Sequence, residues 1–320
     1  MAETILITGG SGFIGVELTK ELINRDNRIV ILDVRSPDSL LGAGNNNVFH
    51  VRGDITSLPQ VLNAVREFKP DTIIHLAALL SEPSEANPWA SINVNALGTY
   101  NVLEAARLFN AKKMVFTSSL AVYVNSRYEV DVIDEETAQR PEIIYGITKV
   151  FSELLGLYYL RKFGLDVRGV RLPVLFGPNV ESPGFGQYNS KLIEAAILGI
   201  PFEVNVPADT VVPLLYIKDA IRSLVMLYGA PEHRLVSRVY NVGQIMPPPT
   251  TEDIVKMVRR HYPDAQITFK TDPRFAEVTR NTPRRIKGDK ARDEWGWDVR
   301  YSLQEAVEDF IQTFTRNWAQ

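Results

Sequence analysis

The sequence predicts an α/β fold built on a doubly wound parallel sheet, and three observations lead to this prediction. Short runs rich in β-branched residues alternate with longer amphipathic stretches, as parallel strands and crossover helices do. Several of the short runs are apolar on both faces, which is typical of strands covered by helices on both sides. The first run leads directly into a glycine-rich turn and a helical segment, as in Rossmann-type sheets.

The elements of this sheet can be placed in order along the chain. Strands are predicted at Thr4–Thr8, Arg28–Asp33, Val48–Arg52, Thr72–Leu76, Lys113–Ser118 and Asp166–Arg171. Six such strands are enough for one doubly wound sheet. Long helices are predicted over Ala86–Asn110, before the fifth strand, and over Tyr145–Phe163, before the sixth.

The composition of the sequence changes after Arg171, where Pro and Gly become frequent. These residues predict loops and short elements. A helix over Ile217–Tyr228 and a strand over Val239–Val242 are expected to return the chain to the sheet. Two further helices are predicted at Thr251–His261 and Ser302–Trp318. We therefore expect a cofactor-binding Rossmann domain of residues 1–174, to which 213–242 return, and a smaller, discontinuous C-terminal substrate lobe of residues 175–212 and 243–320.

Composition limits the classes of partner. With 45% hydrophobic and 23% charged residues, the 320-residue chain can bury a large core. The net charge is -3 and the basic residues are spread along the chain, so neither nucleic acid nor an anionic membrane surface is expected as a partner. No apolar run reaches the roughly 18 residues needed to span a membrane, and no basic segment precedes the short apolar start. We expect a cytoplasmic protein whose partner is a small molecule.

Metal chemistry is not expected either. The chain has no Cys, which excludes disulfides, thiolate ligands and a Cys nucleophile. Its four His residues, at positions 50, 75, 233 and 261, show no metal-ligand spacing.

A glycine-rich turn follows the first predicted strand. It reads Thr8-Gly9-Gly10-Ser11-Gly12-Phe13-Ile14-Gly15, with the spacing G-x-x-G-x-x-G. Gly9 permits a tight turn, Gly12 lets a phosphate approach the backbone, and Gly15 lets helix and strand pack closely. Backbone N–H groups and the helix dipole then converge on a point suited to a pyrophosphate, where Phe13 and Ile14 open the helix. We predict that these residues bind a dinucleotide, although a simple strand-to-helix turn is the alternative for the glycines alone.

Asp33 indicates which dinucleotide to expect. It ends the second predicted strand, 18 residues after Gly15, where a carboxylate can accept hydrogen bonds from ribose hydroxyls. Arg35 could pair with the 2′-phosphate of NADP, but a carboxylate facing that position would repel the phosphate. The predicted cofactor is therefore NAD.

Tyr145 and Lys149 are spaced i and i+4 and so share one face of a predicted helix. A phenol with a pKa of about 10 is a poor base at neutral pH, and an adjacent ammonium favours its ionised form. Ser119 follows the fifth predicted strand, at the edge where open α/β sheets bind ligands. We predict that Tyr145 takes the proton of an alcohol, Lys149 supplies charge and binds the nicotinamide ribose, and Ser119 holds the substrate oxygen. In isolation, a solvated pair and a turn hydroxyl are the alternatives.

These and other motifs resemble the extended short-chain dehydrogenases/reductases of the NAD-dependent epimerase/dehydratase superfamily over nearly the whole chain. The other motifs are Gly53-Asp54-Ile55, His75-Leu76-Ala77-Ala78, Asn95 and Ser119-Leu120-Ala121-Val122-Tyr123. The resemblance implies a homodimer through a bundle of Ala86–Asn110 and Tyr145–Phe163. It also implies further cofactor contacts from Asp54, Ile55, Leu76, Ala77, Ala78, Asn95, Tyr145, Lys149 and Pro173.

Within that superfamily the chain resembles the short-chain type of L-threonine 3-dehydrogenase, which oxidises a secondary hydroxyl to a ketone with NAD. Shared segments include Leu79-Leu80-Ser81, Ile144-Tyr145-Gly146 and Trp295-Gly296-Trp297. The resemblance implies that Ser81, Ser119 and Tyr145 face the substrate.

Three segments depart from that pattern. Pro183-Gly184-Phe185-Gly186-Gln187-Tyr188 replaces a Gly- and Thr-rich loop ending in Asp-Tyr, Val211 replaces an Arg, and Thr282-Pro283 replaces Trp-Pro. Phe185 and Gln187 give the expected substrate loop an apolar surface and a neutral amide, which favours a ligand differing from threonine in shape or charge. Arg280, Arg284 and Arg285 form either a charged surface stretch or a site for an anionic substrate.

The preferred interpretation is an NAD-dependent oxidation of a secondary alcohol in a small polar substrate. A nucleotide-sugar (UDP-sugar) 4-epimerase or a sugar-acid dehydrogenase of the same superfamily would use the same Tyr/Lys pair. Against the epimerase, nucleotide diphosphates need fixed cations, and Val211 stands where such enzymes commonly carry Arg. A non-catalytic NAD(P)-sensing regulator is the remaining alternative, but such proteins typically lose the Tyr or the Lys, and Tyr145 and Lys149 are both present.

Overall fold

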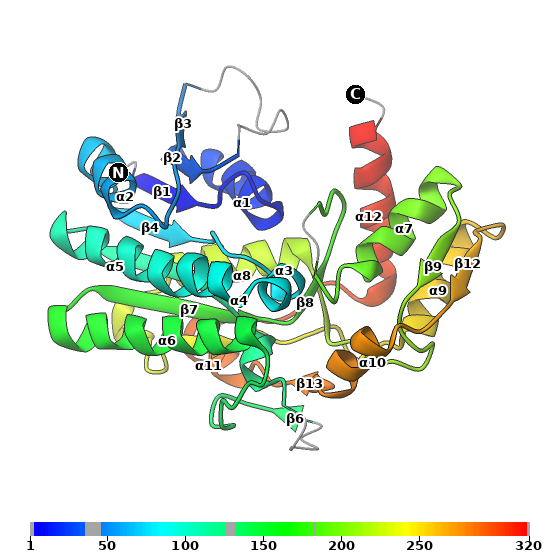
Figure 1. The fold of residues 1–320 in the computed structure, drawn as a ribbon. Coiled ribbons are helices and arrows are strands. Elements are labelled where there is room, and N and C mark those ends of the chain that lie inside the picture. Colours follow the sequence, from blue (N-terminus) through cyan, green and yellow to red (C-terminus); the bar gives the residue numbers. More distant parts are fainter. Residues whose placement is uncertain (1–2, 36–45, 126–131, 182–183, 319–320) are drawn as a thin grey trace.

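The main sheet of the protein contains seven parallel strands and has helices on both faces (Figure 1). The computed structural model describes residues 3–35, 46–125, 132–181 and 184–318. The strands of this sheet are β1 (Thr4–Thr8), β2 (Arg28–Asp33), β3 (Val48–Arg52), β4 (Thr72–His75), β5 (Lys113–Ser119), β7 (Asp166–Leu172) and β11 (Val239–Asn241). Their order is β11-β7-β5-β4-β1-β2-β3.

This sheet confirms the predicted doubly wound fold. The six predicted strands are present with ends that differ by one residue at most, and the predicted return of the chain is also found, because β11 pairs with β7 from Val239 opposite Gly169 to Asn241 opposite Arg171. Both halves of the sheet start from β1, which lies between β4 and β2. The carboxyl ends of all seven strands therefore meet at one edge.

The helices that cover the sheet bury their apolar faces against it. These are α1 (Phe13–Ile23), α2 (Leu58–Phe68), α5 (Gly98–Leu108), α6 (Ile144–Phe163) and α8 (Ile217–Gly229). Along β1, Ile5 and Ile7 join a core that includes Leu18 of α1, whereas Leu6 joins the opposite core with Val61 of α2 and residues of α5. Because both faces are covered, β1, β2 and β4 are apolar on both faces over most of their length, which is the pattern that predicted a parallel sheet.

The single helix predicted over Ala86–Asn110 is wrong. The segment instead contains the end of α3 (Ser81–Ala86), then α4 (Pro88–Ser91), a π-helical turn (Ile92–Leu97) and α5. Asn87 interrupts the helix because the residue before a proline disfavours the helical conformation, and its side chain accepts a hydrogen bond from the Ala90 N–H at 3.1 Å to cap the new start.

The remaining elements lie mainly to one side of the sheet in Figure 1. They are β6 (Val132–Ile133), β8 (Val174–Phe176), α7 (Tyr188–Leu198), β9 (Phe202–Val204), β10 (Leu214–Tyr216), α9 (Thr251–His261), β12 (Ile267–Phe269), α10 (Pro273–Arg280), β13 (Arg285–Ile286), α11 (Asp289–Trp295) and α12 (Leu303–Trp318). Pairing of β9 with β12 brings the two segments predicted to form the substrate lobe together. β13, however, pairs with β6 from the first half of the chain.

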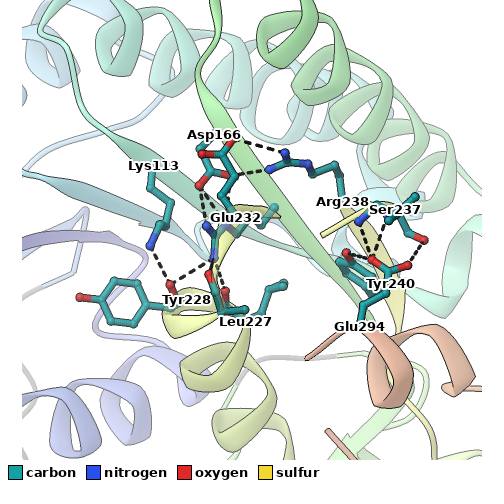
Figure 2. Close-up of polar contacts among 12 residues, drawn as sticks. Lys113, Asp166, Leu227, Tyr228, Glu232, Ser237, Arg238, Tyr240 and Glu294 are labelled. Atoms are coloured by element: carbon teal, nitrogen blue, oxygen red, sulfur yellow. Dashed lines mark hydrogen bonds and ion pairs between the residues drawn. The ribbon is translucent and has the colours of Figure 1, made fainter. Parts of the chain in front are cut away.

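A buried arginine connects strand β7 of the main sheet to the carboxyl end of helix α8. Arg168 of β7 is 2% exposed, and its guanidinium binds both oxygens of Asp166 at 2.6–3.1 Å. The same guanidinium donates to the carbonyls of Leu227 and Ala230 at 2.7 Å, which supplies partners for the last carbonyls of α8. In Figure 2, Asp166 also faces Arg238, which donates to it at 2.9 Å, and Lys113 donates to the Tyr228 carbonyl.

We predict that Arg168→Met lowers the free energy of unfolding by about 3–5 kcal/mol, because it leaves buried carbonyls without donors and Asp166 with one cation fewer. Arg238→Met is the matched control. Its guanidinium pairs with the same Asp166 but with the exposed Glu232 on its other side, so the loss should be about 1 kcal/mol. Urea denaturation measures both, and equal losses would contradict the special role of Arg168.

Candidate active site

The carboxyl edge of the main sheet opens into a cavity of about 590 Å³. Loops after β1, β2, β3, β4 and β5 line it, together with the start of α6 and the segment after β7. All predicted site residues except Asn95 line this cavity: Gly9, Gly12, Phe13, Ile14, Gly15, Asp33, Asp54, Ile55, Leu76, Ala77, Ala78, Ser81, Ser119, Tyr145, Lys149, Pro173, Phe185 and Gln187. The structure therefore brings residues from 9 to 187 into one site.

The glycine-rich turn has the geometry of an anion cradle. Gly9 has a φ of +71°, and a Cβ there would lie 2.7 Å from the backbone of Ala77. A Cβ on Gly15 would lie 2.5 Å from the Gly9 carbonyl oxygen, so strand and helix could not pack this closely with any side chain present. Gly12 caps α1 without a side-chain hydrogen bond, which leaves N–H groups of the first turn facing the cavity edge for a phosphate.

Asp33 is fixed at the end of β2 by the backbone. One carboxylate oxygen accepts from the Ser11 N–H at 3.0 Å, and the other accepts from the Arg35 N–H at 2.9 Å. Each oxygen keeps lone-pair capacity on the cavity side, as a ribose requires. The Ser11 hydroxyl oxygen nearby is buried without a partner. These residues fit the adenosine ribose and pyrophosphate of NAD.

Arg35 lies across the glycine-rich turn. Its guanidinium donates to the Ser11 carbonyl at 2.5 Å and approaches Glu181 at 3.4 Å, from the segment after β8. The side chain is 44% exposed, so solvent screens its ion pair. The Arg35 guanidinium therefore has one partner in the glycine-rich turn and another in the segment after β8.

The three predicted catalytic residues meet at the inner part of the cavity. Tyr145 and Lys149 lie one turn apart near the start of α6, and the Tyr145 hydroxyl is hydrogen-bonded to Ser119 at the end of β5. The Lys149 ammonium donates to the Thr117 carbonyl at 2.8 Å and lies 5.6 Å from the centre of the Tyr145 ring. Tyr145, Lys149 and Ser119 therefore all line the same cavity, where one bound molecule could contact the three of them.

Burial sets the protonation of this group. It raises the pKa of Tyr145 to about 12, against the opposing hydrogen bond with Ser119. It lowers the pKa of Lys149 to about 8, and the negative charge of Glu153 opposes this shift. The sequence led us to expect that the ammonium favours the phenolate, but burial outweighs that influence on Tyr145 in the chain without dinucleotide.

A buried ion pair supports the catalytic helix from behind, and the sequence analysis missed it. The Arg171 guanidinium of β7 donates to both oxygens of Glu153 at 2.9 and 2.8 Å, and the Ser118 hydroxyl donates to the same carboxylate at 2.5 Å. Both charged residues are less than 10% exposed. The signal was present, because Glu153 comes four residues after Lys149 and so shares its helix face.

His75 was dismissed as a metal ligand and has a structural position. Its ring nitrogens bond to the Thr8 hydroxyl at 2.7 Å and the Thr99 hydroxyl at 3.0 Å. Burial, followed by the charge of Lys149, lowers the pKa of His75 to about 3. The imidazole is therefore neutral and ties β1, β4 and α5 together under the cavity.

Asn95 lies behind the cavity wall. Its side chain accepts from the Leu79 N–H at 2.8 Å and donates to the Leu79 carbonyl at 3.0 Å. It also approaches Thr148 of α6 at 3.3 Å. Because Leu79 lines the cavity, any influence of Asn95 on the cofactor would act through this loop.

The substrate side combines residues from distant segments. The Ser81 hydroxyl accepts from the Phe185 N–H at 3.4 Å, and the ring of Phe185 contacts Phe275 of α10 edge to face at 5.0 Å. Val278 and Thr282 also line the cavity, and no periodic pattern in the sequence had indicated them. Arg280, Arg284 and Arg285 are exposed and do not line it, which favours the charged-surface interpretation.

The residues that the structure describes contain neither a membrane-spanning helix nor a cluster of metal ligands. Among the helices in residues 3–35, 46–125, 132–181 and 184–318, none has the length and apolar character needed to cross a membrane. Within the same ranges, His, Asp and Glu side chains form no group of three or more that could hold a metal ion.

A dinucleotide cradle and a Tyr/Lys/Ser group at the carboxyl edge of a parallel sheet define an extended short-chain dehydrogenase/reductase. The chain belongs to the NAD dependent epimerase/dehydratase family, whose model matches residues 5–243. An uncharacterized epimerase/dehydratase of Staphylococcus haemolyticus is 34% identical over 313 residues, which cover 96% of each chain.

Similar solved structures carry more than one activity. L-threonine dehydrogenase from Phytophthora infestans is 31% identical, with a TM-score of 0.89 over 98% of this chain and 99% of that one. UDP-glucose 4-epimerase from Thermotoga maritima shares the fold at 22% identity, with a TM-score of 0.86 over 99% of this chain and 100% of that one. Family membership alone therefore leaves the reaction open.

The burial of Lys149 predicts a dependence of stability on pH. The folded chain releases this proton above about pH 8, whereas the unfolded chain keeps it up to about 10.5, so the unfolded state binds more protons in this window. The free energy of unfolding of the wild type should therefore rise relative to Lys149→Met by about 2 kcal/mol between pH 7 and pH 10.

Urea denaturation of the dinucleotide-free proteins at several pH values measures this difference. Lys256→Met is the control, since Lys256 is 62% exposed and its variant should follow the wild type at every pH. Parallel stability curves for wild type and Lys149→Met would contradict the shifted pKa.

Proposed function

We propose that this protein is an NAD-dependent dehydrogenase that oxidises the secondary alcohol of a small polar substrate to a ketone, the reaction type of the L-threonine 3-dehydrogenases. The observation that carries this proposal is the contact of Tyr145 with Ser119, beside the Lys149 ammonium, in the cavity that also contains the glycine-rich turn. The similarity to L-threonine dehydrogenase supports it.

The residues divide the chemistry between them. Ser119 and Tyr145 would bind the substrate hydroxyl, and the phenolate of Tyr145 would accept its proton. Lys149 would bind the nicotinamide ribose, and its ammonium would stabilise that phenolate against the burial that raises the pKa of Tyr145. Bound NAD would supply the hydride acceptor. The Glu153–Arg171 pair holds α6 so that base and cation keep their positions.

The cofactor would be held mainly by the backbone turn at Gly9, Gly12 and Gly15 and by Asp33. Asp54 and Ile55 after β3 would border the adenine, and Leu76, Ala77, Ala78 and Pro173 would border the nicotinamide half. These assignments rest on the positions of the residues around one cavity. The small residues after β4 leave room for the dinucleotide to pass.

UDP-sugar 4-epimerisation is disfavoured as the reaction. A nucleoside diphosphate sugar carries two phosphate charges into the substrate half, and those need fixed cations. Arg280, Arg284 and Arg285 are exposed and away from the cavity, and Val211 does not line it. Assays with UDP-glucose and UDP-galactose test this alternative alongside NAD reduction with L-threonine and other secondary alcohols.

We also propose a homodimer through α5 and α6. These neighbouring helices expose large apolar side chains, including Tyr100 and Leu108 on α5 and Phe151, Leu154 and Tyr158 on α6, each between 40% and 59% exposed. α5 and α6 run side by side in Figure 1. A second copy of the same face would remove this apolar surface from water.

Tyr145→Phe should lower kcat by about 10²–10⁴-fold, since only the proton-accepting oxygen is deleted. NAD affinity and the fold should be retained. Tyr262→Phe is the matched control, because Tyr262 does not line the cavity and its variant should keep full turnover. NAD reduction at saturating substrate measures kcat, and near-normal turnover of Tyr145→Phe would rule out the assigned base.

The wild type should use NAD at least about 10-fold more efficiently than NADP, because Asp33 accepts from the ribose hydroxyls and repels a 2′-phosphate. Asp33→Ala should move the preference toward NADP, because it removes the carboxylate that repels the 2′-phosphate and that lies 4.0 Å from the Arg35 guanidinium. Comparing kcat/KM for the two cofactors measures this. If the wild type used NADP as efficiently as NAD or better, the charge of Arg35 and not that of Asp33 would decide which cofactor is preferred.

A further inference from the structure

The two ends of the cavity differ in charge. Asp33, Arg35 and Asp54 line the end that contains the glycine-rich turn. Around Ser119 and Tyr145, the lining residues within the described ranges are apolar or uncharged, apart from Lys149. The Lys149 ammonium is already bonded to the Thr117 carbonyl and is 7% exposed. A substrate ammonium would therefore meet no counter-charge among the described lining residues of this end, and a carboxylate would meet only the Lys149 ammonium, which the proposed function assigns to the nicotinamide ribose.

Gln187 lines this end of the cavity and carries a buried, unpaired polar atom. Its side-chain carbonyl oxygen is buried and has no hydrogen-bond partner, although the residue lines the cavity. The surrounding backbone is fixed, because the Gln187 N–H donates to the Gly184 carbonyl at 3.0 Å and its own carbonyl accepts from Ser190 and Lys191. A Cβ on Gly186 would lie 2.5 Å from Val174, so the loop is pressed against β8 next to Pro173.

Buried carbonyl oxygens in proteins are almost always paired, and an unpaired one beside a cavity is suited to a ligand donor. The adjoining wall is apolar: Phe185 packs on Phe275, and Val278 completes it from α10. A low-dielectric wall strengthens a hydrogen bond to Gln187 and penalises an unpaired charge. A substrate cation would, in addition, be repelled by the Lys149 ammonium.

We infer that the substrate is an uncharged secondary alcohol with a second hydrogen-bond donor, and that the Gln187 carbonyl accepts from that donor. This inference rests on the proposed dehydrogenase function and narrows its substrate class. Gln187 is then a specificity residue, and it discriminates against substrates whose second group is a carboxylate or an ammonium. L-Threonine, which carries both, should be a poorer substrate than neutral alcohols of the same size.

Matched alcohols test this with the wild type alone. NAD reduction is followed with 2,3-butanediol, which is neutral with a second donor, and with 2-butanol, which lacks that donor. 3-Hydroxybutyrate, 1-amino-2-propanol and L-threonine add a charge. We expect kcat/KM for 2,3-butanediol to exceed each of the other four by at least about 10-fold, because a site that hydrogen-bonds its substrate rejects analogues lacking the partner. A preference for any charged member would overturn the inference.

Two substitutions of Gln187 test whether this side chain causes the substrate preference. Gln187→Leu should bring 2,3-butanediol and 2-butanol within about 2-fold of each other, since the acceptor is gone. Gln187→Glu, of the same shape, should move the preference toward 1-amino-2-propanol by about 10-fold. Gln312→Leu, on the exposed face of α12, is the control and should keep the wild-type ratios. Unchanged ratios in both Gln187 variants would overturn the role of this residue.

These assays distinguish a failure of the inference about the substrate from a failure of the proposed dehydrogenase function. If alcohols are oxidised but the charged ones are favoured, the dehydrogenase function stands and the inference fails. If NAD binds but no member of the panel reduces it, the proposed function itself is contradicted, and the inference falls with it.

Discussion

The proposed catalytic arrangement depends on one buried ion pair, between Glu153 of α6 and Arg171 of β7. Helix α6 carries both Tyr145 and Lys149, and it can position them only if it keeps a fixed register against the sheet. The bidentate contact with Arg171 and the hydrogen bond from Ser118 connect the helix to two neighbouring strands. Such a pair adds little net stability, but removing one partner leaves an uncompensated buried charge, so the register is strongly specified.

Burial and electrostatics act in opposite directions at the catalytic group. Burial raises the pKa of Tyr145 and lowers that of Lys149, and both shifts work against a phenolate beside an ammonium. The same low-dielectric surroundings strengthen any attraction between those charges once they form. Glu153, one turn beyond Lys149, partly restores the ammonium. The protonation states of Tyr145 and Lys149 are therefore sensitive to any positive charge that a bound ligand brings.

The sequence predicted the sheet, and it also predicted that the glycine-rich turn and Asp33 would lie at one edge of it, because these constraints act on local residues. Strands covered on both faces, such as β1, β2 and β4, are apolar over most of their length, and a turn at which Gly9 and Gly15 touch backbone atoms admits no side chain. Ala86–Asn110 was predicted as one helix because its periodicity is helical almost throughout. The break depends on Asn87 before Pro88, and Asn95 within the π-helical turn bonds to Leu79, a contact that is formed only in the folded chain.

The substrate end could not be predicted to the same degree, since its walls come from segments that share no periodic signal. Phe185 and Gln187 were recognised only as departures from a family pattern, whereas Val278 of α10 and Thr282, just after it, line the cavity from nearly 100 residues later. Cofactor binding uses the backbone and tolerates little change, so its residues are recognisable by type. Substrate binding uses side chains on loops, where one exchange, such as an acidic residue for the neutral amide of Gln187, changes the charge of the ligand that the same fold accepts.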